Sequence, residues 1–205
     1  MATGDLFAQL HNPQQNLLPH DGEIYYHGVI FKAKPADDYF KQLLQEIDWQ
    51  PDQAQIGGKI IKTARKVAWH GERDFRYRYS GVEKIAQPWT PTLLSIKKII
   101  ENKSKTTYNS CLLNLYHDGS EGMAWHSDGE KDLKDGAAIA SVSFGAERRF
   151  MFKHKQNKEK VAIVLAHGSL LIMQGETQKH WLHRLPTTVK ITEPRINLTF
   201  RTIEQ

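Results

Sequence analysis

Two stretches of the chain repeat their apolar residues with the period of an α-helix. The first is DDYFKQLLQEIDW, residues 37–49, whose acids stand at its start, where the helix dipole favours negative charge. The same spacing recurs in PTLLSIKKIIENK, residues 91–103, with Thr90 as a candidate N-cap and Pro91 at the first helical position. We therefore expect two amphipathic helices in the first half of the chain.

From about residue 108 the pattern changes to short apolar or alternating segments. Turn-forming residues separate these segments, as is typical of β-strands joined by tight connections. Several short strands after two helices favour an antiparallel sandwich or barrel braced by helices. The segments are NSCLLNLY (109–116), AAIASVSFG (137–145), RRFMFKHK (148–155), KVAIVLAHGSLLIMQG (160–175) and RINLTFRTI (195–203).

The last segment places apolar and polar residues on opposite faces, because side chains alternate along a strand. The apolar face carries Ile196, Leu198 and Phe200. The polar face carries Arg195, Asn197, Thr199 and Arg201. We expect the apolar face to pack against helices or a second sheet. The polar face needs a partner of its own, since two arginines are rarely buried without anions.

Two strands with polar faces could line a barrel that holds a small polyanion. Asn114 and Tyr116 share a face of the segment 109–116, just as the two arginines share a face of the last segment. The alternative is that both polar faces meet solvent. Solvated strands usually carry Lys, Glu and Thr in preference to paired Arg, so we favour the polyanion.

Composition indicates one soluble globular domain. The chain has 205 residues, of which 40% are hydrophobic and 25% charged. Residues 1–23 are polar and turn-rich, and we expect a flexible arm there, followed by a single domain over 24–205 that is a monomer. No apolar run reaches the roughly 20 residues of a membrane helix, and the N-terminus lacks the layout of a secretory signal.

Cys111 is the only cysteine, which excludes an internal disulfide and a zinc–thiolate cage. We expect a cytoplasmic protein, or a nuclear one in a eukaryote.

Positive charge is concentrated between Lys59 and Tyr79. Seven basic residues stand there against two acids, and seven minus two equals the net charge of +5 of the whole chain. The segment also contains four aromatic residues: Trp69, Phe75, Tyr77 and Tyr79. Basic groups for phosphates and flat rings for bases are typical of nucleic-acid binding. A solvated face with some buried rings is the alternative.

The stretch AWHSDGE, residues 124–130, places His126 and Asp128 two positions apart. On an extended segment both side chains point the same way, so they can occupy adjacent positions on one metal ion. A distal histidine would complete a facial triad with open positions on Fe(II). The pair alone is a weak signal in a chain with ten histidines. The candidates for the third ligand are His154, His167, His180 and His183.

Five motifs carry a resemblance to a known family. They are, in order, NLYHDGSEGMAWHSDGE, IASVSFGAERRFMF, LAHGSLLIM, HWLHRLP and PRINLTFRTI. Together they resemble the AlkB family of Fe(II)/2-oxoglutarate dioxygenases, and most closely its branch that repairs alkylated nucleic acids. The resemblance covers about residues 55–203. It implies an α+β, mainly β fold, a double-stranded β-helix (jelly-roll) at about 108–203 braced by helices, with an N-terminal nucleotide-recognition lid at about 55–80.

The resemblance also implies the metal and cosubstrate residues. The Fe(II) ligands would be His126, Asp128 and His183, with His180 left as a neighbour. Arg195 would pair with the distal carboxylate of 2-oxoglutarate, helped by Tyr116 and Asn197. Arg201 and Asn114 would lie near the carboxylate that chelates the iron. Bidentate pairing with carboxylates favours arginine over lysine at such positions.

The implied reaction is oxidative demethylation of bases such as 1-methyladenine and 3-methylcytosine in DNA or RNA. O2 and 2-oxoglutarate are consumed, and succinate, carbon dioxide, formaldehyde and the unmodified base are released. The base must leave the stack to reach the metal. By position, Tyr77 and Tyr79 correspond to the lid, where an aromatic ring and His126 enclose the base. Glu130 corresponds to an acid near the exocyclic amine.

One feature departs from the family pattern. Members that act on duplexes carry a bulky residue in the hairpin before the lid, which wedges base pairs apart. The matching stretch here is QIGGK, in which Gly57 and Gly58 follow Ile56. This favours single-stranded DNA or RNA as the substrate. Two alternatives remain: a dioxygenase of the same family acting on protein or lipid, and a nucleic-acid-binding module without catalysis.

Overall fold

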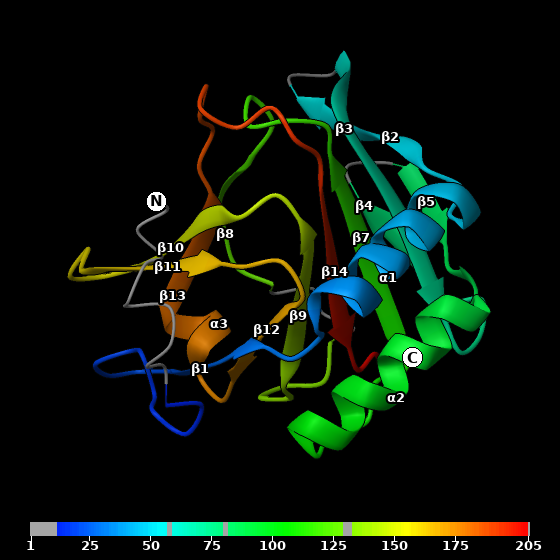
Figure 1. Cartoon of the computed structure of the whole chain (residues 1–205). Helices are drawn as coiled ribbons and strands as arrows, with labels where there is room; N and C mark the ends of the chain where they lie inside the picture. Colours follow the sequence, from blue (N-terminus) through cyan, green and yellow to red (C-terminus); the bar gives the residue numbers. More distant parts are fainter. Residues whose placement is uncertain (1–11, 57–58, 80–81, 129–132, 205) are drawn as a thin grey trace.

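The computed structural model describes residues 12–204 except 57–58, 80–81 and 129–132. Two antiparallel sheets face each other, and helices α1 and α2 cover the outer side of the larger sheet (Figure 1). The helices are α1 (Ala33–Glu46), α2 (Pro91–Ser104) and α3 (Thr177–His180). The architecture is therefore α+β and mainly β, as the strand pattern predicts.

The larger sheet is eight-stranded, in the order β1-β12-β9-β14-β7-β3-β2, with β6 paired in parallel to β3. Its strands are β1 (Glu23–Val29), β2 (Gln50–Ile56), β3 (Lys59–Gly71), β6 (Gln87–Pro88), β7 (Ser110–Tyr116), β9 (Ile139–Gly145), β12 (Ser169–Gln174) and β14 (Arg195–Arg201). The smaller sheet has the order β11-β10-β13-β8. Its strands are β8 (Met123–His126), β10 (Arg148–His154), β11 (Lys160–Leu165) and β13 (Trp181–Leu185).

All five segments expected as strands contain strands. The segment 160–175 is divided into two, β11 and β12, by a turn at Gly168. Gly168 has φ +73, and a Cβ there would lie 2.7 Å from the carbonyl oxygen of Phe31. This position therefore requires glycine twice over, for its left-handed backbone and for close approach. The pattern analysis did not predict the strands before residue 108, nor β8 and β13.

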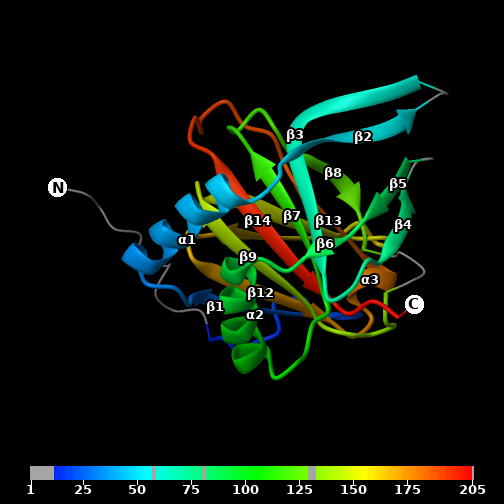
Figure 2. The same ribbon diagram turned by 90° about the vertical axis from the view of Figure 1, so that its right-hand side faces the viewer.

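Two hairpins extend the fold. In the view of Figure 2 they lie on the right, the same side as β8. One is formed by β2 and β3, whose far ends project beyond the rest of the larger sheet. The other is a separate two-stranded sheet formed by β4 (Arg76–Tyr79) and β5 (Val82–Ile85). One strand of each hairpin, β3 and β4 respectively, belongs to the basic and aromatic segment of the chain.

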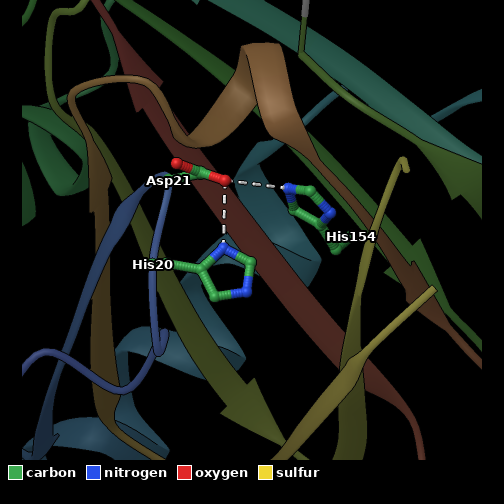
Figure 3. A group of neighbouring side chains, drawn as sticks. All are labelled: His20, Asp21 and His154. Carbon is green, nitrogen blue, oxygen red and sulfur yellow. Dashed lines mark hydrogen bonds and ion pairs between the residues drawn. The ribbon is translucent and has the colours of Figure 1, made fainter. Parts of the chain in front are cut away.

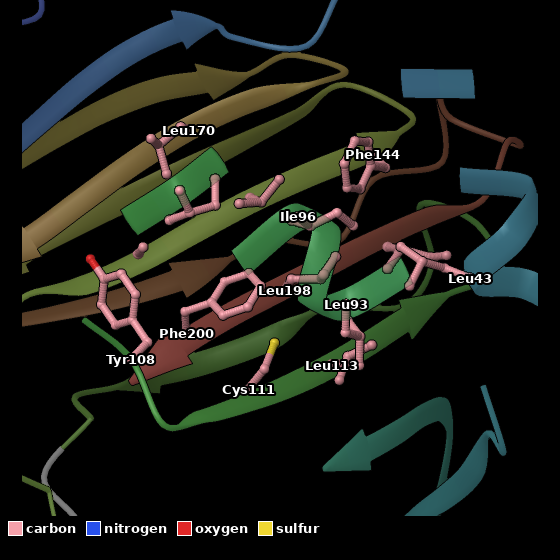
Figure 4. Close-up of a cluster of buried hydrophobic side chains, with 14 of the residues drawn as sticks. Leu43, Leu93, Ile96, Tyr108, Cys111, Leu113, Phe144, Leu170, Leu198 and Phe200 are labelled. Atoms are coloured by element: carbon pink, nitrogen blue, oxygen red, sulfur yellow. The ribbon is translucent and has the colours of Figure 1, made fainter. Parts of the chain in front are cut away.

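The larger hydrophobic core lies between the helices and the outer face of the larger sheet (Figure 4). From β14 it includes Ile196, Leu198 and Phe200, all fully buried. From α2 it includes Leu93, Ile96 and Ile100. The apolar face of β14 packs against helices, as its alternation predicts.

A second core fills the space between the two sheets. The larger sheet contributes side chains such as Tyr116 on β7 and Leu171 on β12, and the smaller sheet contributes Phe152 and Trp181. The polar face of β14 points into this same space, since all seven residues of the strand are buried and its apolar face is turned to the helices. The fold thus places two arginines inside the molecule rather than in solvent.

Helix α1 begins and ends earlier than the expected range of 37–49. It spans Ala33–Glu46, with Pro35 in the first turn, where proline costs no hydrogen bond. The acids Asp37 and Asp38 therefore lie in the second turn and not at the start. After Glu46 the chain is extended, and the Trp49 indole donates to the carbonyl oxygen of Leu43 at 3.2 Å. Helix α2 matches its expected range and cap, because the Thr90 hydroxyl accepts from the amide of Leu93.

Residues 12–22 form turns that pack against the fold. The Asn16 side-chain oxygen accepts from the amides of Leu18 and Ile24 at 3.0 Å each, and Leu18 is buried. The Trp181 indole donates to the carbonyl oxygen of His20. The remainder of the expected arm, residues 1–11, lies outside the described residues. The division into an arm at 1–23 and one domain at 24–205 stays a prediction.

Among the described residues, no helix has both the length and the apolar character needed to cross a membrane.

The contrast between Leu93 and Leu94 gives a test of the helix–sheet core. Leu93 is fully buried and Leu94 is 48% exposed one position along α2. We expect Leu93→Ala to lower the free energy of unfolding by about 2–5 kcal/mol, because it leaves a cavity. Leu94→Ala should change it by about 0.5 kcal/mol or less. Equal effects in denaturant unfolding would contradict this packing of α2.

Candidate active site

Three of the expected residues meet between the sheets. His126 ends β8, Asp128 follows two residues later, and His183 lies on β13 directly opposite His126 in the strand pairing. The Nε2 atoms of His126 and His183 each lie 3.9 Å from Oδ1 of Asp128. One donor atom from each of the three residues lies within 4.8 Å of the others. Two separate strands therefore bring the ligand set together, which a local motif cannot do.

The protonation of these residues suits a divalent metal. The Nδ1 atom of His126 lies 2.8 Å from the carbonyl oxygen of Ala124, so that nitrogen carries the proton and Nε2 is free to bind a metal. Burial lowers the pKa of His183 to about 4, although the Asp128 carboxylate opposes the shift. His183 is therefore neutral near pH 7. Two imidazoles and one carboxylate fit Fe(II).

The Asp128 carboxylate is held ionised. Burial alone would raise the pKa of Asp128, but its neighbours, of which the Arg201 guanidinium contributes most, outweigh burial and lower it. A guanidinium nitrogen of Arg201 lies 2.8 Å from Oδ1 of Asp128. The backbone amide of Asp128 donates to the Gln178 side chain. Asp128 and Arg201 both line a cavity of about 280 Å³.

Arg195 is buried without an acid. It is 1% exposed, and burial lowers its pKa to about 10, so it is still charged at neutral pH. One guanidinium nitrogen donates to Ser143 at 2.9 Å and to Asn197 at 2.7 Å, and Nε has no hydrogen-bond partner. Among the described residues, no carboxylate pairs with Arg195. A buried cation with spare donors is a site for an anion.

The opposing strand supplies the other expected cosubstrate residues. Tyr116 lies across from Arg195 in the pairing of β7 with β14, and Asn114 lies across from Asn197. The Arg195 guanidinium carbon lies 5.5 Å from the centre of the Tyr116 ring. The structure thus gathers Asn114, Tyr116, Arg195 and Asn197 on one interior surface. Their roles stay predictions.

Sequence reasoning missed some members of this surface. Arg65 was counted in the basic surface segment, but it is buried, donates to Asn114 at 2.6 Å and pairs with Asp52. Asp52 lies on the neighbouring strand β2, and no spacing rule joins it to Arg65. Ser141 and Ser143 could have been found, because their alternation along β9 repeats that of β14.

Three of the four candidate third ligands lie away from the triad. His180 belongs to α3 and lies 3.9 Å from Glu176. His167 faces Asp37 at 3.2 Å. His154 belongs to a different cluster, with His20 and Asp21 (Figure 3). Among the candidates only His183 meets His126 and Asp128.

The expected substrate residues are only partly described. Tyr77 and Tyr79 lie on β4, with their side chains outside the described part of the structure. Glu130, Gly57 and Gly58 also lie outside the described residues. Their roles stay predictions.

For one aromatic residue of the basic segment, the expected contact with a base is wrong. Phe75 is 3% exposed and stacks on Trp69 with ring centres 6.5 Å apart, so it packs inside the fold and is not a surface ring for a base.

A family model described as the 2OG-Fe(II) oxygenase superfamily matches residues 22–201. DNA oxidative demethylase ALKBH2 of Mus musculus is 36% identical over 212 residues, which cover 98% of this chain and 89% of that protein. The chain belongs to the AlkB family of 2OG-Fe(II) oxygenases. It is an Fe(II)/2-oxoglutarate-dependent dioxygenase, and the His126–Asp128–His183 cluster fits this chemistry.

Other AlkB proteins also match most of this chain. DNA oxidative demethylase ALKBH2 of Homo sapiens is 40% identical and covers 85% of this chain and 71% of that protein. Alpha-ketoglutarate-dependent dioxygenase alkB homolog 3 of Homo sapiens is 39% identical and covers 87% of this chain and 65% of that protein. The solved structure of OsALKBH1 matches with a TM-score of 0.65 at 16% identity, over 87% of this chain and 97% of that chain. This last likeness shows the fold alone.

The two neighbouring histidines of β13 and α3 give a test of the metal centre. We expect His183→Ala to abolish Fe(II) binding, because it removes one of three converging donors. His180→Ala should keep the parent affinity, since its side chain is 38% exposed and lies outside the cluster. Anaerobic metal titration measures both, with circular dichroism to confirm folding. Lost binding in His180→Ala with normal binding in His183→Ala would identify the other histidine as the ligand.

Proposed function

We propose that this enzyme oxidatively demethylates N-alkylated bases of nucleic acids, such as 1-methyladenine and 3-methylcytosine. The observation that carries the proposal is the metal-ligand cluster of His126, Asp128 and His183 beside a buried arginine that lacks an acid, Arg195. The relatives named as DNA oxidative demethylases support the substrate class. The reaction converts O2 and 2-oxoglutarate to carbon dioxide and succinate, and one oxygen atom enters the methyl group, which leaves as formaldehyde.

The three residues of the cluster bind the metal in this proposal. Fe(II), when bound, supplies the activation of O2 that is coupled to decarboxylation of 2-oxoglutarate. Asp128 contributes a negative charge that Arg201 keeps ionised, and His126 is oriented by the carbonyl oxygen of Ala124. Hydrogen bonds of this kind to the ligands fix their geometry and raise metal affinity.

The polar face of β14 binds the cosubstrate. Arg195 pairs with the distal carboxylate of 2-oxoglutarate, and Tyr116 and Asn197 assist it. Arg201 and Asn114 lie near the carboxylate that chelates the metal. Support comes from the burial of Arg195 and from its free Nε, since a dicarboxylate would supply the missing charge and the missing acceptor.

The same proposal includes the type of β-fold, the domain bounds and a lid over the active site. The two facing sheets are a double-stranded β-helix at about 108–203, within a single domain at 24–205. The β2–β3 and β4–β5 hairpins, at about 55–80, are a nucleotide-recognition lid. Support comes from the basic residues that β3 and β4 carry.

The substrate enters as a base turned out of its stack. Tyr77, Tyr79 and His126 enclose it, and Glu130 accepts a hydrogen bond from the exocyclic amine. The basic hairpin segment binds the phosphate backbone, which makes affinity fall with salt. We propose that the enzyme acts as a monomer where its nucleic acid is found, in the cytoplasm or in a eukaryotic nucleus.

The function is tested by product formation on a defined oligonucleotide. With Fe(II), 2-oxoglutarate and O2, a single-stranded oligonucleotide carrying 1-methyladenine should yield formaldehyde and succinate in equal amounts. Asp128→Asn should yield neither, because it removes a ligand charge at the metal. His180→Ala is the matched control and should retain activity.

Succinate release that does not rise with the methylated oligonucleotide would contradict the proposal and favour a protein or lipid substrate. Oligonucleotide binding without any succinate would point to a binding module.

Strand preference follows from the hairpin sequence. Extruding a base from a duplex costs unpairing energy, which proteins with a wedge offset by filling the gap. Ile56, Gly57 and Gly58 offer little to insert. We expect a higher initial rate on a single-stranded oligonucleotide than on its matched duplex at the same low salt. Equal or faster reaction on the duplex would contradict this preference.

A further inference from the structure

A second cluster of metal-ligating side chains joins the N-terminal turn to the smaller sheet. His20 and Asp21 lie in the turn before β1, and His154 is the last residue of β10. Figure 3 shows the Asp21 carboxylate between the two imidazole rings. One donor atom from each residue lies within 4.8 Å of the others. His154 is far in sequence from His20 and Asp21, and the proposed reaction uses none of the three.

The distances from the carboxylate to the two imidazoles suit a tetrahedral metal. Oδ2 of Asp21 lies 3.0 Å from Nδ1 of His20 and 3.4 Å from Nε2 of His154. Ligands about 2.0–2.1 Å from a tetrahedral zinc ion are separated from one another by roughly 3.3 Å. Both distances lie close to this value. At the iron triad the carboxylate lies farther from each imidazole, at 3.9 Å.

The imidazole of His154 points into the cluster with a ring nitrogen, Nε2, that could bind a metal and makes no hydrogen bond. The residue is 2% exposed, and its Nε2 has no hydrogen-bond partner. Oδ2 of Asp21 lies 3.4 Å from this nitrogen, and the two atoms form an ion-pair contact without the alignment of a hydrogen bond. A buried ring nitrogen without a partner costs free energy, which a bound metal would recover.

His20 has the outer contact typical of a zinc-bound histidine. Its Nε2 lies 3.0 Å from the Glu159 carboxylate, on the opposite side of the ring from Asp21. Metal-bound imidazoles usually donate their second N–H to a carboxylate in this way. The His20 and Asp21 side chains are 38% and 53% exposed, so a metal ion has access from solvent.

We propose that His20, Asp21 and His154 form a second metal site, which binds zinc and is distinct from the iron centre. The two imidazoles and one carboxylate are borderline and hard donors of the kind that zinc accepts, and water completes the tetrahedron. The site is structural. It ties the N-terminal turn to β10, whose residue His154 pairs with Trp181 at the start of β13, the strand that carries His183.

Zinc competes with protons at this site. The Glu159 and Asp21 carboxylates accept hydrogen bonds from the His20 ring and raise the pKa of His20, so the ring holds its proton more firmly than a free histidine does. At His154, Nδ1 accepts from the Asn157 amide at 3.3 Å. Zinc binding requires that the metal-facing nitrogen of each histidine carries no proton. Zinc binding is therefore tested at mildly alkaline pH.

The experiment counts zinc in protein whose iron centre has been disabled. The variant His126→Ala with Asp128→Asn is stripped with chelator, equilibrated with zinc at mildly alkaline pH and freed of unbound metal. We expect one zinc ion per chain and a higher Tm than in the stripped protein. Adding His20→Gln should abolish both effects, and Asp21→Asn should do the same. Adding Glu159→Gln should weaken binding about 10–100-fold.

The matched control is His117→Gln. His117 is a similarly exposed histidine, 2.9 Å from Glu121, outside both clusters, so the zinc count should not change. Apart from Asp128, which is buried, the altered residues are exposed or half-exposed histidines and acids, and circular dichroism confirms that each variant is folded. If the disabled parent binds no zinc, or if His20→Gln and Asp21→Asn bind as much as the parent, His20, Asp21 and His154 are only an ion-pair cluster.

Discussion

The interior of this enzyme is organised around the need of two buried arginines for negative charge. Arg201 meets the Asp128 carboxylate at 2.8 Å, which also keeps that carboxylate ionised. Arg195 meets only a hydroxyl and an amide, and its Nε has no partner. Leaving a buried charge without its counter-charge is strongly unfavourable, by about 3–5 kcal/mol when a partner is removed. The same strand thus holds one cation paired with a carboxylate and, among the described residues, one that has no carboxylate partner, in the family whose cosubstrate is a dicarboxylate.

The position of β14 follows from its alternation. Its apolar residues complete the core beneath α1 and α2, and its polar residues face the smaller sheet. A shift of one residue in its pairing with β7 and β9 would exchange the two faces, so the hydrophobic core also fixes where the guanidinium groups point. The polar interior surface and the stability of the fold therefore depend on one register. Across the gap, pairing of β13 with β8 sets His183 opposite His126.

Local pattern predicted what depends on neighbours in sequence. The faces of β14, the helix α2 with its Thr90 cap, and the His126-x-Asp128 pair were all readable, because periodicity and capping are local properties. The start of α1 was wrong by four residues, since Pro35 is tolerated in a first turn. The choice of His183 over His180 needed family resemblance or structure, because strand pairing is not local. The burial of Arg65 against Asp52 and Asn114 was missed for the same reason.

The most direct test of the central claim separates cosubstrate binding from stability in Arg195→Met. If Arg195 is kept buried in order to bind a carboxylate, the variant should lose 2-oxoglutarate affinity by about a hundredfold or more in a calorimetric titration with Mn(II) in place of Fe(II). Without cosubstrate, its free energy of unfolding should equal or exceed that of the parent, because a buried unpaired charge has been removed. Normal 2-oxoglutarate affinity together with a large loss of stability would contradict the claim and make Arg195 a structural residue.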